Sequence, residues 1–276
     1  MMDSPELNSH FLEARPPFSK NAVNRQGKNW RDGGDCDLDL IESFLEYNSE
    51  YLDQLLQLAH QTIKSLILPL TPGTAQGVAP DTQNYLLTAR VKTTDTLRQK
   101  LVRMETTPLL NIQDVAGLRF DCDVSLSQQT KIAEIFVQEF SNAGASRVDI
   151  RDLRTSPHSG YRAIHLHIRA AAGRAEMQIR TALQSQWANL YEEAADIYGR
   201  DIRYLHEGAT VPSGAEHVIQ SLHALSSLIN RFETAADLAS GTSFDEIELM
   251  KSTVSNNLGT LHTELRQARL RISQER

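Results

Sequence analysis

The stretch HSGYRAIHLHIRAAAGRAEMQIRTALQSQW, His158–Trp187, decides the fold. Apolar residues alternate in its first half, at Ile164, Leu166 and Ile168, as they do on a strand with one buried face. The same alternation returns in RAEMQIR, and the residues that follow have helical spacing. The stretch therefore predicts two strands and a helix, with the polar side chains of each strand on one face.

The polar side of these two strands gathers groups that an ordinary surface strand does not need. They are Tyr161, His165, His167, Glu176, Gln178 and Arg180. If the strands are neighbours, one face holds an aromatic ring, imidazoles, a carboxylate, an amide and a guanidinium. A tyrosine there can stack on a purine, and a carboxylate can bind a metal ion or take a hydroxyl proton. A merely wetted polar face is common for one strand, but two strands that agree favour a functional site.

Strand and helix patterns alternate around this stretch, from residue 84 to residue 213. Strands are predicted at YLLTARVK, LRFDCDV and RVDI, and helices at TLRQKLVRM, SLSQQTKIAEIFVQEFSNAG and TALQSQWANLYEEAADIYGR. Mixed alternation of this kind favours an α/β or α+β domain built on one central sheet. The fold class that we predict is α+β, a mixed central sheet flanked by helices, with helical extensions at both ends.

Composition divides the chain into four parts. Residues 1–37 are polar, with scattered Gly and Pro, and predict a flexible arm that carries five basic residues. Residues 38–80 predict a helical segment, as one long helix or two short ones, and then a loop. Residues 81–212 hold the predicted sheet domain. Apolar stripes over residues 213–276 predict a C-terminal helical hairpin, whose default role is packing.

Length and charge narrow the class of protein. The chain has 276 residues, of which 40% are hydrophobic, so we expect one or two domains with a real core. Its net charge of −7 argues weakly against broad coating of nucleic acid. The two cysteines, Cys36 and Cys122, have no metal or redox spacing. The start has no signal-peptide pattern and the longest apolar run is too short for a membrane helix, so we expect a cytoplasmic protein without membrane association.

Five residues of one basic cluster predict a site for a polyphosphate. Arg90 and Lys92 share a face of a predicted strand, and Thr96, Lys100 and Arg103 share a face of the next helix. A tight turn between the two elements would aim four cations and a hydroxyl at one point, which suits a chain of phosphates. Spacing alone leaves a solvated basic face with salt bridges open as the alternative.

Asp114 and Arg119 flank the start of the next predicted strand. A carboxylate at a sheet edge, near cations, is the kind of ligand that Mg²⁺ takes together with substrate phosphates. The alternative is a surface pair between Asp114 and Arg119, worth about 1 kcal/mol or less. Asp121 and Asp123 follow on the same strand, where we expect an exposed strand end rather than further ligands.

Five motifs, in order, resemble the synthetase domain of the RelA/SpoT proteins. They are R-x-K-x3-T-x3-K-x2-R, D-x2-G-L-R, S-G-Y-R-x2-H, A-E-x-Q-I-R-T and W-A. The resemblance covers roughly residues 84–205 and leaves out the large hydrolase and regulatory domains of the long enzymes. It implies a nucleotidyltransferase-like α+β fold, in a small alarmone synthetase or a related single-domain toxin.

The resemblance also implies an activity and a role for each matching residue. The family transfers a pyrophosphoryl group from ATP to a ribose 3′-hydroxyl, with Mg²⁺ as cofactor. Asp114 and Glu176 would bind Mg²⁺ and act in catalysis, and Glu176 would also activate the 3′-hydroxyl. The residues that bind ATP would be Arg90, Lys92, Thr96, Lys100, Arg103 and Arg119, with the adenine between the first and last of these arginines. The residues that hold the acceptor would be Tyr161, stacked on its base, with His165, Gln178 and Arg180.

Three positions depart from the family pattern, all on the acceptor side. Pro157 and His158 stand where a lysine often precedes the Gly-Tyr pair. Tyr191 and Glu192 replace an acid–histidine pair, and a later Tyr-Lys pair ends in Gly199 instead. Since these positions help the family to hold the phosphates of the acceptor, the departures affect the GDP or GTP acceptor and hardly touch the ATP side.

Three functions stay open on the sequence. The first is synthesis of the (p)ppGpp alarmone from ATP and GDP or GTP. The second is a toxin-like pyrophosphokinase acting on the 3′ end of tRNA or on an adenine nucleotide; seven arginines against three acids in residues 146–180 leave local support for tRNA. The third is a catalytically degenerate protein that binds a nucleotide or a partner, which the intact Asp114 and Glu176 argue against. An antitoxin protein and a homo-oligomer are further partners that we consider.

Overall fold

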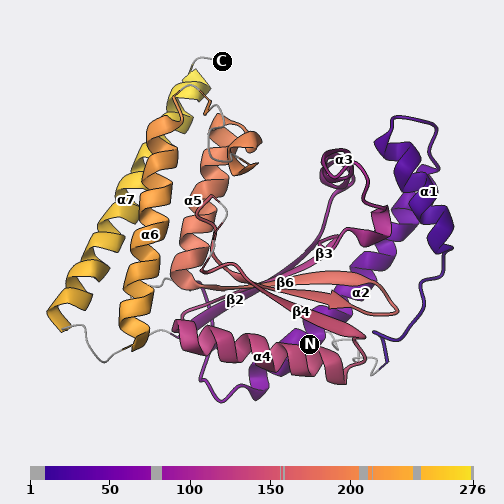
Figure 1. The fold of residues 1–276 in the computed structure, drawn as a ribbon, viewed down its shortest axis with the longest axis horizontal. Helices are drawn as coiled ribbons and strands as arrows, with labels where there is room; N and C mark the ends of the chain where they lie inside the picture. The colour runs from indigo at the N-terminus through magenta and orange to yellow at the C-terminus, as the bar shows by residue number, and fades with distance from the viewer. Residues whose placement is uncertain are drawn as a thin grey trace.

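A six-stranded mixed sheet forms the centre of the computed structural model (Figure 1). The structure describes residues 10–75, 83–155, 157, 159–204, 211–212, 214–238 and 244–274. The strand order is β1-β2-β3-β6-β5-β4, with β1/β2 and β3/β6 parallel and the other pairs antiparallel. The strands are β1 Thr71–Pro72, β2 Asn84–Val91, β3 Ala116–Cys122, β4 Arg147–Asp152, β5 Ile164–Arg169 and β6 Arg174–Thr181. The α+β prediction is confirmed, and the two strands of the opening stretch are neighbours.

Two long helices cover one face of the sheet, α2 (Leu38–Ser65) and α4 (Leu126–Asn142). The main core lies between them and the strands, where Leu55, Phe136 and Leu166 are fully buried. Ile164, Leu166 and Ile168 point into this core as the alternation predicts. The segment that the sequence left as one helix or two is the single helix α2.

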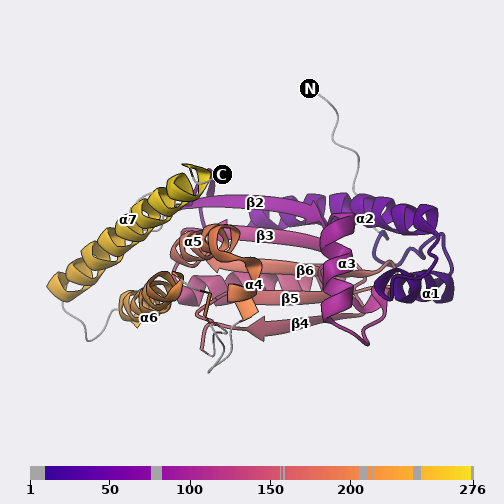
Figure 2. The ribbon, with the colours of Figure 1, turned by 90° about the horizontal axis from the view of Figure 1, so that it is seen from above.

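The other face of the sheet is flanked at its two ends by α3 (Thr94–Arg103) and α5 (Ala182–Tyr198), which leaves its middle open between them. Figure 2 shows α3 lying across the strands. Both helices begin with a threonine cap: the Thr93 side chain accepts a hydrogen bond from the Thr96 amide, and Thr181 forms a capping box with Gln184. The caps set the first residues of the two helices that flank the open face.

The prediction of a flexible arm over residues 1–37 is wrong for its described part. Residues 20–31 form helix α1 (Lys20–Arg31), in which Val23 and Trp30 are buried against α3 and the short 3-10 helix η1 (Leu109–Asn111). Because only this narrow stripe of α1 is buried, most of its residues can be polar. Gly27 allows the close approach, since a Cβ atom there would lie 2.6 Å from the Cβ of Leu109. Residues 1–9 of the predicted arm and 76–82 around the predicted loop lie outside the described residues.

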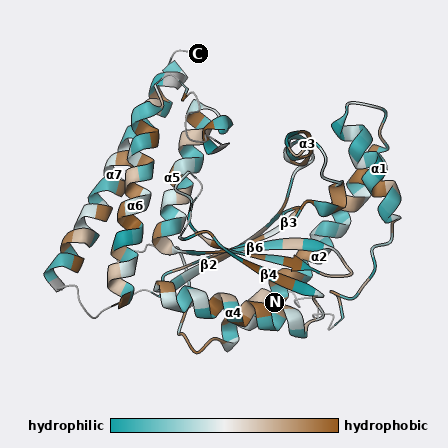
Figure 3. Cartoon of the chain, viewed as in Figure 1, coloured by the Kyte–Doolittle hydropathy of each residue, from teal (hydrophilic) through white to brown (hydrophobic). Residues whose placement is uncertain are grey.

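Helices α6 (Glu216–Leu238) and α7 (Phe244–Gln274) stand where the sequence predicts a helical hairpin. With α5 and the 3-10 helix η2 (Arg200–Tyr204), they form a second core, to which Leu190, Leu222 and Leu258 contribute. Apolar residues are interspersed with polar ones along these helices (Figure 3), as amphipathic packing requires. Within the described part of the chain, no helix has the length and apolarity needed to cross a membrane.

Candidate active site

The strand register aligns the predicted polar residues in rows across the open face. In one row, Arg90 on β2 stands opposite Gly117 on β3, and Gly117 stands opposite Glu176 on β6. In the next row, Arg119 stands opposite Gln178, and Gln178 stands opposite His165 on β5. Since paired residues point to the same face, these side chains meet over the middle of the sheet. Adjacent strands thus bring together residues that are far apart in the sequence.

A cavity of about 160 Å³ opens over these rows. Its lining comprises Thr88, Ala89, Arg90, Lys92, Asp114, Gly117, Leu118, Arg119, Glu176 and Gln178. Gly117 keeps the floor open between Arg90 and Glu176, because a Cβ atom there would meet only the Arg90 carbonyl oxygen, at 3.6 Å. The cavity therefore joins two predicted metal ligands, Asp114 and Glu176, to three predicted ATP-binding residues.

Asp114 is held between two lysines. The Lys100 Nζ atom lies 2.5 Å from Oδ1 of Asp114, and the Lys92 Nζ atom lies 2.9 Å from Oδ2. Burial opposes ionisation of Asp114, but the charges and hydrogen bonds of the two lysines outweigh it and lower its pKa. The carboxylate is therefore ionised at neutral pH. The alternative of a surface pair between Asp114 and Arg119 is not what the structure shows, because Asp114 forms ion pairs with Lys92 and Lys100 instead.

Glu176 belongs to a hydrogen-bonded chain on the acceptor side. The His165 Nδ1 atom lies 2.5 Å from Oε1 of Glu176, and the Tyr161 hydroxyl lies 3.0 Å from the other ring nitrogen of His165. The Tyr161 hydroxyl also lies 3.3 Å from Oε1 of Gln178. Burial would raise the pKa of Glu176, but the hydrogen bond and charge of His165 lower it below the ordinary value. Burial also raises the pKa of Tyr161 to about 12.

The predicted phosphate cluster is brought together in part. Arg90 and Lys92 line the cavity, and Lys100 reaches it through Asp114. Thr96 and Arg103 lie on α3, outside the lining. The Thr96 hydroxyl lies 3.0 Å from the Thr93 carbonyl oxygen, to which it donates.

The part of the chain that holds this site is similar to a known protein family. Residues 89–202 match the family model described as the region found in RelA / SpoT proteins. These residues form a RelA/SpoT domain. The matched residues include all of the cavity lining except Thr88, together with the Asp114 cluster and the chain from Tyr161 to Glu176.

Similar proteins and structures extend the match beyond this domain. Proteins of Mycobacterium tuberculosis (strain ATCC 25618 / H37Rv) and Mycobacterium bovis, both named uncharacterized, are 42% identical to this chain over 193 residues. The match covers 70% of this chain and 64% of each relative, less than two thirds of their length. The small alarmone synthetase 1 from Bacillus subtilis is 22% identical, with a TM-score of 0.50, over 73% of this chain and 96% of that one. The structure of that protein bound to its product pppGpp is 20% identical over the same shares, with a TM-score of 0.51. The chain thus has the small alarmone synthetase fold.

Arg180 of the RelA/SpoT domain has a structural partner that the sequence did not reveal. It is 1% exposed, and its Nε and Nη2 atoms lie 2.8 and 2.9 Å from the two carboxylate oxygens of Asp121. Ser185 at the start of α5 donates to the same carboxylate at 2.7 Å. The expectation that Asp121 lies at an exposed strand end is wrong, because this buried pair ties β3, β6 and α5 together. The contact of Arg180 with an acceptor stays a prediction.

The acceptor side holds further residues that sequence reasoning missed. The sequence assigns no role to His167, but one ligand atom from each of His165, His167 and Glu176 lies within 4.8 Å of the others. Ser226 on α6 donates to the carbonyl oxygen of Gly160 at 2.5 Å, which holds the loop before Tyr161. No local pattern could reveal the latter contact, since 66 residues separate its partners.

The residues that depart from the family pattern lie in different structural settings. Tyr191 is buried in the second core: its ring stacks on Trp187 at a centroid distance of 5.0 Å, and its hydroxyl donates to the Ile202 carbonyl oxygen. Gly199 ends α5 with a φ of 102°, which favours glycine. His158 lies outside the described residues. Tyr191 therefore takes a packing role at a position where the family uses a polar pair.

Proposed function

We propose that this RelA/SpoT domain transfers the β,γ-pyrophosphoryl group of ATP to the ribose 3′-hydroxyl of GDP or GTP and so makes the (p)ppGpp alarmone. The observation that carries the proposal is the cavity in which the ionised carboxylates of Asp114 and Glu176 stand together with Arg90, Lys92 and Arg119. Cations for a polyphosphate and carboxylates for a metal ion are the parts that phosphoryl transfer needs.

The donor side of the proposal rests on the lysines around Asp114. Lys92 directly follows strand β2 and Lys100 lies on helix α3, and both reach one carboxylate. Phosphates that enter the cavity would form ion pairs with these two ammonium groups, whose positive charge complements their negative charge. Arg90 and Arg119 line the same cavity and would hold the adenine between them. Thr96 and Arg103 would contact the phosphates from α3.

The carboxylates fit the Mg²⁺ ion that the family uses. Asp114 and Glu176 line the same cavity, and the negative charge of Asp114 opposes the lowering of the Glu176 pKa by His165 without overcoming it. Hard oxygen donors of this kind suit Mg²⁺, which takes one or two carboxylates along with substrate phosphates. The ion would neutralise the charge that builds up on the transferred group. The residues that would hold it are Asp114 and Glu176.

The acceptor side provides positioning and a proton acceptor. The 3′-oxygen would attack the β-phosphorus of ATP. The bond between the β-phosphorus and the oxygen that bridges the α- and β-phosphates would break, and AMP would leave with that oxygen. The hydroxyl proton would pass to the Glu176 carboxylate, which His165 holds in place. Tyr161 would stack on the acceptor base, and Gln178 and Arg180 would support the acceptor. The small alarmone synthetase 1 structure with its product pppGpp supports a guanine nucleotide as acceptor.

A second candidate has specific support, namely the same transfer onto the 3′ end of tRNA or onto an adenine nucleotide. Tyr191 is packed in the second core, so the usual grip on the acceptor phosphates is missing at that position. Arg147 and Arg151 lie on β4, the last strand in the order, and stand opposite Arg169 and His165 on β5. Arg147 and Arg151 are exposed, which suits a phosphate backbone.

The experiment that tests the proposal gives the purified protein ATP labelled on the γ-phosphate, Mg²⁺, and GDP, GTP, ATP or deacylated tRNA in separate reactions. We expect label on GDP or GTP, and none with a Glu176→Gln variant that still binds ATP. Label on tRNA or ATP alone would replace the proposal by the second candidate. ATP binding without any transfer would contradict both and favour a degenerate nucleotide-binding protein.

A further inference from the structure

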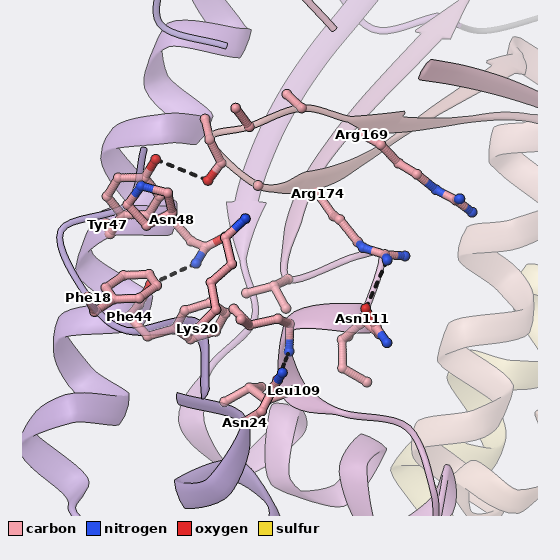
Figure 4. A pocket seen from close by; sticks show the side chains of 18 residues that line it. Phe18, Lys20, Asn24, Phe44, Tyr47, Asn48, Leu109, Asn111, Arg169 and Arg174 are labelled. Carbon is pink, nitrogen blue, oxygen red and sulfur yellow. Dashed lines mark hydrogen bonds between the residues drawn. The ribbon is translucent and has the colours of Figure 1, made fainter. Parts of the chain in front are cut away.

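A second pocket, of about 300 Å³, lies between α1, α2, η1 and the turn that joins β5 to β6 (Figure 4). It shares no lining residue with the cavity that holds Glu176. Its size is at the lower end of the range typical of small-molecule sites. Neither the fold nor the proposed transfer reaction explains why it is there.

Three cations, Lys20, Arg169 and Arg174, line this pocket from different sides, and no acidic side chain is among the described residues that line it (Figure 4). Lys20 forms no ion pair with any acid in the described ranges, and its side chain extends into the pocket in Figure 4. Arg174 donates to Oδ1 of Asn111 at 2.8 Å, which is a neutral partner. The positive charge at the pocket is therefore compensated only in part.

The two arginines are neighbours on the same face of paired strands, since Arg169 stands opposite Arg174. The Nη2 atom of Arg169 is 3.7 Å from the nearest oxygen of Asp149, and its Nε atom is buried without a hydrogen-bond partner. Burial and the charge of Arg169 both lower the pKa of Arg174. A bound anion would offset this repulsion and could supply the missing acceptor.

The opposite wall of the pocket is aromatic. The Phe18 ring packs edge-on against Phe44 and Tyr47, at centroid distances of 5.8 and 5.4 Å. The Tyr47 hydroxyl donates to the Ala172 carbonyl oxygen at 3.0 Å, which fixes this wall to the β5–β6 turn. Leu109 and Ile112 complete the apolar surface. A flat apolar group fits such a wall better than a hydrated ion does.

The pocket is preformed by contacts that do not depend on a ligand. The side-chain amide of Gln113 donates from Nε2 to the carbonyl oxygens of Ile168 and Ala175, at 3.1 and 2.6 Å. These bonds connect the segment after η1 to the ends of β5 and β6. The Leu110 amide donates to Oδ1 of Asn24 on α1 at 3.0 Å. Binding there would cost little ordering of the chain.

We propose that this pocket binds a small ligand in which a phosphate group is joined to a flat ring, the class that includes nucleoside monophosphates. Lys20 and Arg174 would bind the phosphate, with Arg169 contributing its charge and its Nε–H group. The ring would lie against Phe18, Phe44 and Tyr47. A dianionic phosphate matches three cations better than a carboxylate does. This site is independent of the proposed transfer reaction.

The test is calorimetric titration of the full chain with phenyl phosphate, inorganic phosphate and phenol. Phenyl phosphate contains the ring and the anion and is too small to occupy the transfer site as a nucleotide would. We expect a Kd on the order of 1 mM or tighter for phenyl phosphate, with weaker binding of the two fragments. Binding of inorganic phosphate as tight as that of phenyl phosphate would contradict the role of the ring.

Variants assign the binding to the pocket. Lys20 is exposed, so a Lys20→Glu variant should fold normally. It should weaken phenyl phosphate binding at least about tenfold. Lys28→Glu makes the same charge change on an exposed residue of the same helix, outside the lining, and should bind like the wild type. Lys100→Ala, beside the transfer cavity, should also bind like the wild type. Equal binding by Lys20→Glu and Lys28→Glu, loss in Lys100→Ala, or no heat with phenyl phosphate would each overturn the proposal.

Discussion

The Nδ1 atom of His165 lies 2.5 Å from the Oε1 atom of Glu176, and the Tyr161 hydroxyl lies 3.0 Å from the opposite ring nitrogen. The imidazole therefore holds the carboxylate in place and favours its ionised form. Glu176 is otherwise buried enough that its carboxyl group would resist ionisation. This pair connects the part of the site that we assign to the acceptor with the part that we assign to the metal ion.

Replacing His165 by Phe should shift the pH dependence of transfer. A carboxyl group whose pKa is lowered in the fold stays ionised until the pH falls through that lowered value. Without His165, burial raises the pKa of Glu176, so the acid limb of the rate profile should move to higher pH. At neutral pH we expect a loss of roughly tenfold or more, the size of a hydrogen bond to a charged group. An acid limb at the wild-type position, measured as transfer rate against pH, would contradict this role.

A side chain at Gly117 should close the transfer cavity without harming the fold. The backbone of Gly117 is part of a regular strand, and an added Cβ atom has only the Arg90 carbonyl oxygen near it, at 3.6 Å. A Gly117→Val variant should therefore keep the wild-type melting temperature within a few degrees and lose ATP affinity by about tenfold or more. Leu86→Val, on the exposed part of β2, is the control. Unchanged ATP affinity in Gly117→Val would show that ATP does not use this cavity.

The buried pair of Asp121 and Arg180 should contribute mainly to stability. Asp121→Asn leaves the guanidinium of Arg180 buried without its counter-charge, which costs about 3–5 kcal/mol of unfolding free energy. Chemical denaturation measures this loss. Glu192→Gln, which breaks the more exposed pair with Arg203, should cost about 1 kcal/mol or less. Similar losses in the two variants would contradict the importance of the buried pair.

Glu233 on α6 should make stability depend on pH in the neutral range. Its carboxyl group accepts hydrogen bonds from Thr181 and from Gln184, the latter at 3.2 Å, and burial raises its pKa to about 7. A carboxyl group with a raised pKa favours the folded state below its ordinary pKa, and this contribution is lost as the pH rises through about 7. The loss is about 3 kcal/mol at most.

The difference in unfolding free energy between the wild type and Glu233→Gln isolates this effect. We expect the wild type to lose stability relative to the variant as the pH rises from about 5 to about 8. The difference also cancels the histidines with lowered pKa values, such as His167 and His223, because both proteins contain them. A constant difference across this range would contradict the raised pKa of Glu233.

Much of the fold and of the site could be predicted from local patterns. The alternation at Ile164, Leu166 and Ile168 predicts which face of β5 is buried and places His165 on the other face. The same alternation on β6 places Glu176 beside it. Helix α1 escaped prediction because it buries so few apolar residues, Val23 and Trp30 among them, that its composition resembles that of a tail.

The features that could not be predicted depend on contacts between distant parts of the chain. The pair of Asp121 and Arg180 depends on the parallel register of β3 and β6, which joins residues 59 positions apart. Local sequence gives no sign of that register, so Asp121 looked like the end of an exposed strand.

The most direct test of the proposed transfer is the identity of the adenine nucleotide that leaves. Transfer of the β,γ-pyrophosphoryl group releases AMP, whereas phosphoryl transfer or simple hydrolysis of the γ-phosphate releases ADP. With ATP, Mg²⁺ and GDP or GTP, we predict that AMP forms in equal amount to the 3′-pyrophosphorylated guanine nucleotide, and that Glu176→Gln lowers both rates by orders of magnitude. ADP as the product, or AMP formation that Glu176→Gln leaves unchanged, would contradict the account.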